Sequence, residues 1–291
     1  MNLQNILSEI EQKDPEVFDK LSDRRKAMKS FSNFAGKVAL ASLPFAFGSM
    51  FKKAYGQTPT DVIAVLNFAL TLEYLEAEFY KKGVASVGLI PAGTPAVGAL
   101  TKIRDDENKH VAFLRTAITA SGGTPVSFTA ANFDFTAGNG SGTGPFVGVF
   151  TNYDLFLAVA QTFEDTGVRA YKGQAGNLIS NNDVLTAALN IHSVEARHAA
   201  HIRYMRRARQ TANPANPLYV GNIKPWVTLK NSNIGSTLVQ ASYDGEEITT
   251  QAGVNILNVG GQTFSAEAAS EAFDEPLTAA QVLAIVDPFI I

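Results

Sequence analysis

The sequence predicts an all-α protein whose centre is a four-helix bundle with one long crossover between its second and third helices. Three observations support this fold: a repeated set of acidic residues and histidines, apolar residues at helical spacing, and the lengths of the three loops. The first and third loops between the predicted helices are short, and the second is long. Four glutamates and two histidines recur in the same order in both halves of the chain: Glu73, Glu107 and His110, then Glu164, Glu195 and His198. Such a set is what four helices need to hold two metal ions between them.

Residues 1–56 are predicted to precede the bundle as a separate segment. Residues 3–21 have the pattern of a short polar helix, and Arg24 and Arg25 precede a mildly apolar run over 31–51. This arrangement resembles a twin-arginine export signal. The alternative is an amphipathic helix that packs on the bundle. The protein is therefore expected either in the periplasm, after export, or in the cytoplasm.

The first bundle helix is predicted to begin near Thr60, after a Gly-Gln-Thr-Pro breaker, and to run to Lys82. At 100° per residue, the apolar residues of this helix centre on Glu73. Glu76 lies on the rim of that apolar face, and Glu78 points away from it. Glu73 is therefore the acidic side chain that this helix is expected to direct into the bundle.

The second, third and fourth helices are predicted over about 93–120, 151–177 and 183–210, with Asn152 or Thr151 near the start of the third. The short joins between helices one and two and between three and four require antiparallel neighbours. The Gly-rich and Thr-rich link over 122–150 is long enough to cross the bundle from end to end.

The two helical pairs are an internal repeat. The first and third helices match at an offset of 91 residues, and the second and fourth match at an offset of 88: Leu66/Leu157, Glu73/Glu164 and Tyr80/Tyr171, then Ile103/Ile191, Glu107/Glu195 and His110/His198. Glu73, and not Glu76, is the partner of Glu164 in this repeat. The repeat therefore selects Glu73 as the candidate ligand.

The remaining 213–291 are predicted to form an extension of mixed structure that packs on the bundle. It is expected to have short strands or irregular structure over 218–260 and two short helices that begin near Ser265 and Thr278. Its larger apolar residues are expected to cover one flank of the bundle: Trp226, Phe264, Phe273, Leu283 and Phe289. A basic run ends the fourth helix and is expected to be a solvated helix end: Arg203, Arg206, Arg207 and Arg209.

Residues 57–212 resemble the ferritin-like superfamily, on the lone glutamate, the Glu-x-x-His and their repetition. Leu72-Glu73-Tyr74 followed by Tyr80 is similar to the first helix of ferritins. More narrowly, the segment 68–80 and the tail segment 272–277 resemble the desiccation-related, stress-response ferritin-like proteins. The resemblance implies a diiron or dimanganese carboxylate site and leaves the reaction open, because the activity of that narrower family is poorly defined as a class.

The chemistry of the six residues suits two iron or manganese ions. Four ionised carboxylates offset two divalent ions, so the cluster is close to neutral inside a bundle. We expect Glu107 and Glu195 to bridge the ions, with Glu73 and Glu164 as terminal carboxylates beside the histidines. The alternative is a polar network without metal. Three further residues are candidates to contact the ligands, although structural roles in the core or on the helix surface are the alternative: Tyr80, Tyr171 and His192.

These features favour a protein that acts on a small oxidant, peroxide or dioxygen, in oxidative or desiccation stress, as a catalase-like or ferroxidase-like oxidoreductase. The alternative is a non-catalytic structural stress protein with a structural or vestigial metal site. Long additions at both ends of the bundle disfavour a closed iron-storage shell. A net charge of −3 provides no general attraction for nucleic acid, no stretch is apolar enough for an integral membrane span, and the fold class suggests a homodimer.

Overall fold

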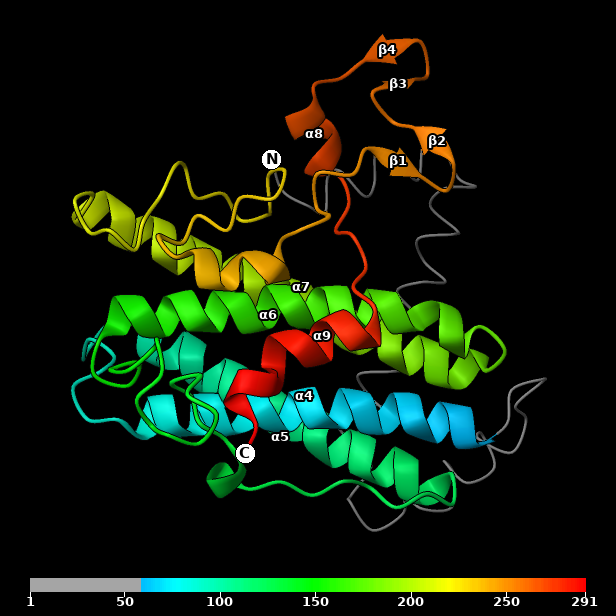
Figure 1. Cartoon of the computed structure of the whole chain (residues 1–291), viewed down its shortest axis with the longest axis horizontal. Coiled ribbons are helices and arrows are strands. Elements are labelled where there is room, and N and C mark those ends of the chain that lie inside the picture. Colours follow the sequence, from blue (N-terminus) through cyan, green and yellow to red (C-terminus); the bar gives the residue numbers. More distant parts are fainter. Residues whose placement is uncertain (1–58) are drawn as a thin grey trace, which may run out of the picture. The chain divides into compact units, whose positions relative to one another are not determined.

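Four long helices form the bundle that the sequence predicts, and the protein is predominantly helical. The computed structural model describes residues 59–291 of the chain, so the predicted polar helix over 3–21 and the export segment within 1–56 lie outside the described residues. The bundle helices are α4 (Pro59–Ala85), α5 (Pro95–Ala120), α6 (Tyr153–Ala175) and α7 (Asn182–Ala212) (Figure 1). Among the described residues, none of the helices is both long and apolar enough to cross a membrane.

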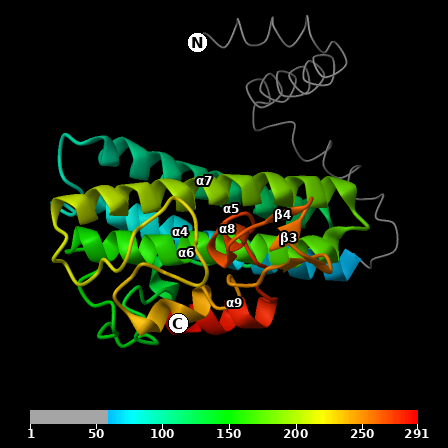
Figure 2. The same cartoon turned by 90° about the horizontal axis from the view of Figure 1, so that it is seen from above.

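Each half of the repeat folds as a helical hairpin, α4 with α5 and α6 with α7, and the two hairpins pack side by side (Figures 1 and 2). Local signals set the helix starts. The Asn152 side chain accepts hydrogen bonds from the backbone N–H groups of Asp154 and Leu155, and Asn181 caps α7 through the N–H of Val184. The predicted cap at Asn152 is therefore confirmed.

The segment between α5 and α6 runs along α4 and provides the predicted crossover. At its start, the Asn67 amide donates to the Thr124 carbonyl oxygen over 3.2 Å. About midway along it, the rings of Phe135 and Phe79 lie 5.6 Å apart between centroids. Asn67 and Phe79 lie three turns apart on α4, so the crossover passes from one end of this helix toward the other. A single 3-10 turn, Ala130–Asn132, interrupts it.

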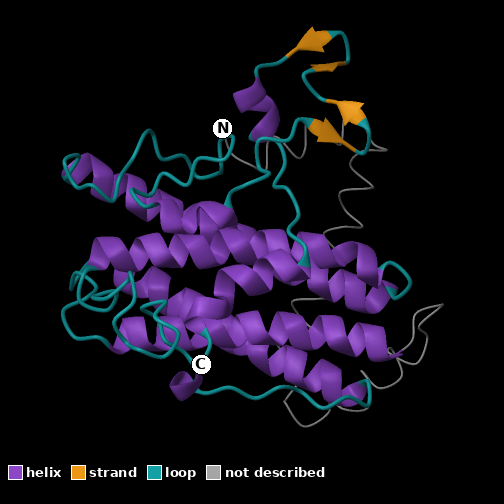
Figure 3. Ribbon diagram, in the orientation of Figure 1, coloured by secondary structure: helices purple, strands orange, loops and turns teal. Residues whose placement is uncertain are grey.

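The C-terminal extension contains the strands of the described chain (Figure 3). Two small antiparallel hairpins pair Thr250–Gln251 (β1) with Val254–Asn255 (β2) and Asn258–Val259 (β3) with Gln262–Thr263 (β4). A 3-10 helix, Thr237–Ser242, precedes them. Two short helices follow, α8 (Ala266–Ser270) and α9 (Ala279–Val286), and α9 packs on α6. Ser265 and Thr278 cap these helices, as their sequence patterns predict.

The basic end of α7 is solvated as predicted only at Arg207 and in part at Arg209, while the other two arginines are buried. Arg203 and Arg206 are 1% and 0% exposed. Arg203 pairs with Asp165 at 3.0 and 2.5 Å, and Arg206 donates to the carbonyl oxygens of Leu218 and Asn233 at 2.9 and 2.8 Å. The extension has little regular structure, so its buried carbonyl groups need donors from elsewhere, and the guanidinium groups supply them.

The predicted apolar flank is also mostly wrong. Four of its residues are 43–48% exposed: Trp226, Phe264, Phe273 and Leu283. Only Phe289 is buried. On α9 the inward positions belong to Val282 and Val286, which lie one turn apart, so the neighbouring Leu283 faces outward.

Candidate metal centre

The six residues predicted from the repeat meet at the centre of the bundle. Each helix contributes to them: Glu73 on α4, Glu107 and His110 on α5, Glu164 on α6, and Glu195 and His198 on α7. The four glutamates are 0% exposed, and the two histidines are buried. Because helical residues three apart share a face, each Glu-x-x-His pair directs both side chains inward.

His110 lies among three of these carboxylates. Its Nδ1 is 3.0 Å from Glu73 Oε2, 3.1 Å from Glu107 Oε2 and 3.1 Å from Glu195 Oε1. The four residues offer ligand atoms that all lie within 4.8 Å of one another. That spacing is compact enough for one ion to contact every member of the group.

His198 lies in a second, equivalent group. Its Nδ1 is 2.8 Å from Glu107 Oε1, 3.4 Å from Glu164 Oε2 and 3.9 Å from Glu195 Oε2. Glu107 and Glu195 belong to both groups. Each of these two residues directs one oxygen toward His110 and the other toward His198. The cluster therefore has two adjacent centres that share two carboxylates.

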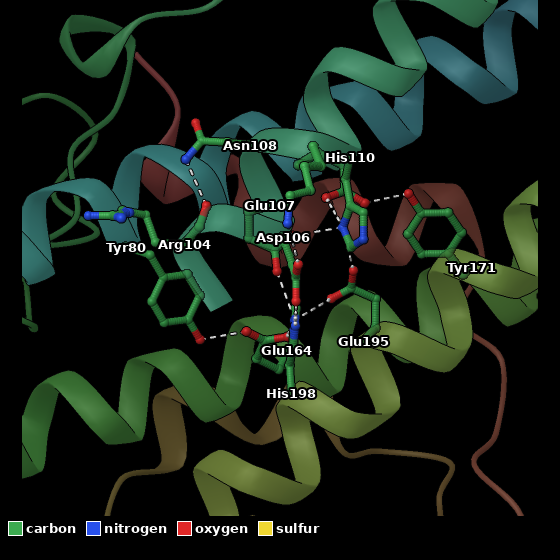
Figure 4. A network of polar contacts seen from close by, with 12 residues as sticks. Tyr80, Arg104, Asp106, Glu107, Asn108, His110, Glu164, Tyr171, Glu195 and His198 are labelled. Carbon is green, nitrogen blue, oxygen red and sulfur yellow. Dashed lines mark hydrogen bonds and ion pairs between the residues drawn. The ribbon is translucent and has the colours of Figure 1, made fainter. Parts of the chain in front are cut away.

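Glu73 and Glu164, the two glutamates that belong to only one group each, are hydrogen-bonded by tyrosines. The two tyrosines lie on opposite sides of the cluster (Figure 4). Tyr80 on α4 donates to Glu164 Oε1 on α6 at 2.5 Å, and Tyr171 on α6 donates to Glu73 Oε1 on α4. Each half of the repeat thus orients the glutamate of the other half. Both hydroxyl groups contact candidate ligands, in addition to their place in the core.

The charges of the cluster oppose its burial. Burial, with the charges of Glu107 and Glu73, raises the pKa of Glu195 well above its ordinary value. Burial also raises the pKa of Glu107 to about 7. Burial lowers the pKa of His198, but the charges of Glu164 and Glu107 outweigh it and raise that pKa to about 11. Protons therefore balance the carboxylates when no cation does, and a bound cation has to displace them.

The unpaired atoms of the cluster fit a metal. Five of its buried polar atoms make no hydrogen bond: Glu107 Oε1, Glu164 Oε2, both carboxylate oxygens of Glu195, and His198 Nδ1. A buried polar atom without a partner is costly. Four of these five atoms are carboxylate oxygens, which can only accept when ionised, and a cation would stabilise such a group of acceptors. Carboxylate oxygens and imidazole nitrogens suit iron, manganese or zinc, so this buried cluster can hold a metal.

Two further acidic residues border the cluster, and the repeat does not identify them. Asp106 Oδ2 lies 3.6 Å from His198 Nε2 and is itself paired with Lys102 and Lys109. A carboxylate on the outer nitrogen fixes the orientation of a ligating histidine. The residue equivalent to Asp106 at the offset of 88 is Val194, so the two halves differ here. The only sequence signal was the acidic run before Glu107.

The second is Glu76, which is 4% exposed and faces the cluster beside Gly167. Burial and the charge of Glu195 raise the pKa of Glu76 well above its ordinary value. A Cβ atom on Gly167 would lie 3.3 Å from Glu76 Oε1 and 3.6 Å from Glu195 Oε2. The glycine therefore leaves room for two carboxyl groups at this point of α6.

His192 lies apart from the cluster. The charged groups that act on it are Asp274 of the extension and Lys172, while burial lowers its pKa. Its Nε2 atom is buried without a hydrogen bond. The structure brings the six repeat residues and the two tyrosines together, and places His192 against the C-terminal tail.

Comparison with known proteins agrees with this geometry. A family model described as a ferritin-like domain matches residues 61–208, which include all six residues of the cluster and the four bundle helices except the first two residues of α4 and the last turn of α7. Comparisons with curated proteins and with solved structures gave no match. The matched region is half of the chain, and the chain belongs to the ferritin-like domain family.

Proposed function

We propose that the protein binds two iron or manganese ions at this cluster and acts as an oxidoreductase on peroxide or dioxygen, in protection against oxidative or desiccation stress. The observation that carries the proposal is the sharing of Glu107 and Glu195, each of which directs one oxygen to each histidine. When bound, two adjacent redox ions supply two electrons to one oxidant molecule.

The residues of the chain would prepare the site for this chemistry. Glu107 and Glu195 would bridge the ions, and Glu73 and Glu164 would be terminal ligands held by the tyrosines. Glu76, whose pKa is raised by burial and by Glu195, would hold a proton beside the cluster. A neutral carboxyl group in this place can donate that proton to an oxygen atom that is being reduced.

A non-catalytic role is the second candidate, because the same site also joins the four helices. The cluster takes one carboxylate from each helix and carries no compensating lysine or arginine among its members. A metal ion there would link the two hairpins and stabilise the fold without turnover. Both candidates require the metal, and only the first requires a reaction.

The first experiment is elemental analysis of the purified protein, before and after anaerobic loading with Fe²⁺ or Mn²⁺. We expect about two ions per chain, as the two groups of ligands indicate. Glu107→Gln should lose most of this metal, because Glu107 serves both groups. The matched control is Glu78→Gln on α4, where the carboxylate pairs with Lys81 at 2.7 Å outside the cluster.

Normal metal content in Glu107→Gln would refute the site. With the metal established, loaded protein is assayed for peroxide disproportionation and for oxygen-dependent oxidation of Fe²⁺. Turnover in either assay supports the oxidoreductase. Full loading without turnover, together with a higher unfolding temperature, supports the structural role.

A further inference from the structure

The two ends of the bundle are related by the internal repeat, but three phenylalanines that pack together at one end have smaller counterparts at the other. Phe79 and Phe156 stack at 4.7 Å between centroids, with 6° between their planes, and Phe163 packs on Phe79 at 5.1 Å. The offset of 91 relates these three phenylalanines to smaller residues at the other end: Ala170, Val65 and Leu72.

The smaller residues leave a cavity of about 20 Å³ at the second end. All three of them line it, with Leu114, Ile191 and the ring of Tyr171. The half-buried rings of Phe68 and Phe113 form part of its wall. This volume is enough for one small molecule of about the size of water. The asymmetry of the repeat thus creates a space that the aromatic end does not have.

The cavity lies directly beside the candidate metal centre. Leu114 is one helical turn after His110, and Ile191 is one turn before Glu195. The Tyr171 ring lines the cavity, and its hydroxyl group donates to Glu73. A molecule in the cavity would therefore be one layer of side chains away from the half of the cluster that contains His110.

The chemistry of the walls selects the occupant. They are aliphatic and aromatic, and the one amide among them, Gln174, already accepts a hydrogen bond from Asn177 at 2.9 Å. A buried water needs two to four polar partners, and an apolar cavity stays dry. Hydrogen peroxide has the same need for donors and acceptors. Dioxygen is small and apolar and makes no such demand.

We propose that this cavity binds one dioxygen molecule and delivers it to the centre from the side of His110 and Glu73. The binding of dioxygen depends only on the cavity. The delivery rests on the proposed function, since it requires a loaded centre that reacts with the gas.

Binding is tested on metal-free protein by methyl NMR under dioxygen pressure, since dioxygen is paramagnetic and relaxes nearby nuclei. The repeat supplies matched controls, because Leu66 and Ile191 line the cavity and Leu157 and Ile103 are their partners at the aromatic end. All four residues are buried. We expect the methyl groups of Leu66 and Ile191 to relax several-fold more than those of their partners. Equal relaxation at both ends would overturn the proposal.

Delivery is tested with Val65→Phe. Phe156 is the repeat partner of Val65 at the aromatic end, so this variant places the same side chain at the cavity end. Val65 is half-buried, so the ring can enter the cavity from its rim. We expect it to abolish the excess relaxation at Leu66 and Ile191. It should also slow the oxidation of bound Fe²⁺ by dioxygen several-fold, while oxidation by peroxide and metal content stay unchanged. Val87→Phe, which adds the same ring at a fully exposed position outside the cavity, should not slow either reaction.

The outcomes separate the two proposals. If Val65→Phe slows dioxygen and peroxide equally, or slows neither, delivery through the cavity is wrong. If neither the unaltered protein nor Val65→Phe binds metal, the proposed function fails. The relaxation measurement on metal-free protein still decides whether the cavity binds dioxygen. If Val65→Phe does not fold, relaxation in the unaltered protein decides binding, and Ala170→Val, a smaller filling of the same cavity, replaces it in the delivery assay.

Discussion

The hydroxyl groups of Tyr80 and Tyr171 are the clearest case in which a single atom sets the geometry of the candidate centre. Tyr171→Phe removes the donor to Glu73, and Tyr80→Phe removes the donor to Glu164. Loss of a contact that orients a ligand weakens metal binding by roughly 10–100-fold. We expect each variant to weaken mainly one of the two ions, and titration with Mn²⁺ followed by calorimetry measures the two affinities.

Tyr74→Phe is the matched control for these variants. Tyr74 is also a buried tyrosine of α4, but its hydroxyl group accepts a hydrogen bond from Arg115 at 2.6 Å, outside the cluster. Its two affinities should equal those of the unaltered protein. An equal loss in all three variants would mean that the hydroxyl groups act on general stability and not on the ligands.

At the level of residues, the sequence predicted the members of the cluster but not its full surroundings. Glu73 could be chosen over Glu76 because the two halves of the repeat can be aligned, and Glu73 is the residue that aligns with Glu164. The same comparison could not find Asp106, since its partner Val194 differs. Nor could it show that Glu76 stays beside the cluster, which depends on the space left by Gly167 on another helix.

Among the elements, helices were predicted to within a few residues wherever their signals are local. Apolar periodicity and caps such as Asn152 and Thr278 act within one or two turns. The burial of Arg203 and Arg206 was not predictable in this way, because their partners lie on α6 and in the extension. Helical periodicity cannot report which carbonyl groups of a distant irregular segment need donors.

Helix α6 contacts the backbone of the extension so closely at Gly173 that only glycine fits there. A Cβ atom on Gly173 would lie 1.9 Å from the Leu277 carbonyl oxygen, which is backbone and cannot move aside easily. We expect Gly173→Ala to lower the free energy of unfolding by about 1–3 kcal/mol. Gly176→Ala is the control, since its Cβ atom would meet nothing within 4 Å, and it should be neutral or slightly stabilising. Urea unfolding of both variants measures the difference.

Over the whole molecule, buried arginines join the extension to the bundle. Arg169 of α6 donates to the carbonyl oxygens of Glu275 and Ser242, both at 2.7 Å, and pairs with Glu246 at 2.7 Å. Arg206 of α7 makes the equivalent bonds to Leu218 and Asn233. These guanidinium groups hydrogen-bond to carbonyl oxygens of the extension, so they fix its backbone against the bundle in addition to the apolar residues that it buries there.

The Glu246 carboxyl group should make stability depend on pH. Burial, partly offset by Arg169, raises the pKa of Glu246 from its ordinary 4.5 to about 7. The folded state therefore binds this proton more tightly than the unfolded state does. The stabilisation is complete below pH 4.5 and is lost as the pH rises through 7, by at most about 3 kcal/mol. Urea unfolding at pH 5 and pH 8 should show a smaller loss in Glu246→Gln than in the unaltered protein. The same loss in both would exclude Glu246 as its source.

Metal binding should stabilise the molecule through the link that it makes between the hairpins. An ion that binds only the folded state adds about 2.7 kcal/mol when its free concentration is a hundred times Kd. We expect Mn²⁺ or anaerobic Fe²⁺ to raise the free energy of unfolding of the unaltered protein and of Glu78→Gln, but not of Glu107→Gln. Because the ions displace protons from carboxyl groups such as Glu107, whose pKa burial raises to about 7, the gain should shrink below that pH. An equal gain in Glu107→Gln would place the stabilising ion elsewhere, since that variant removes a carboxylate that both centres share.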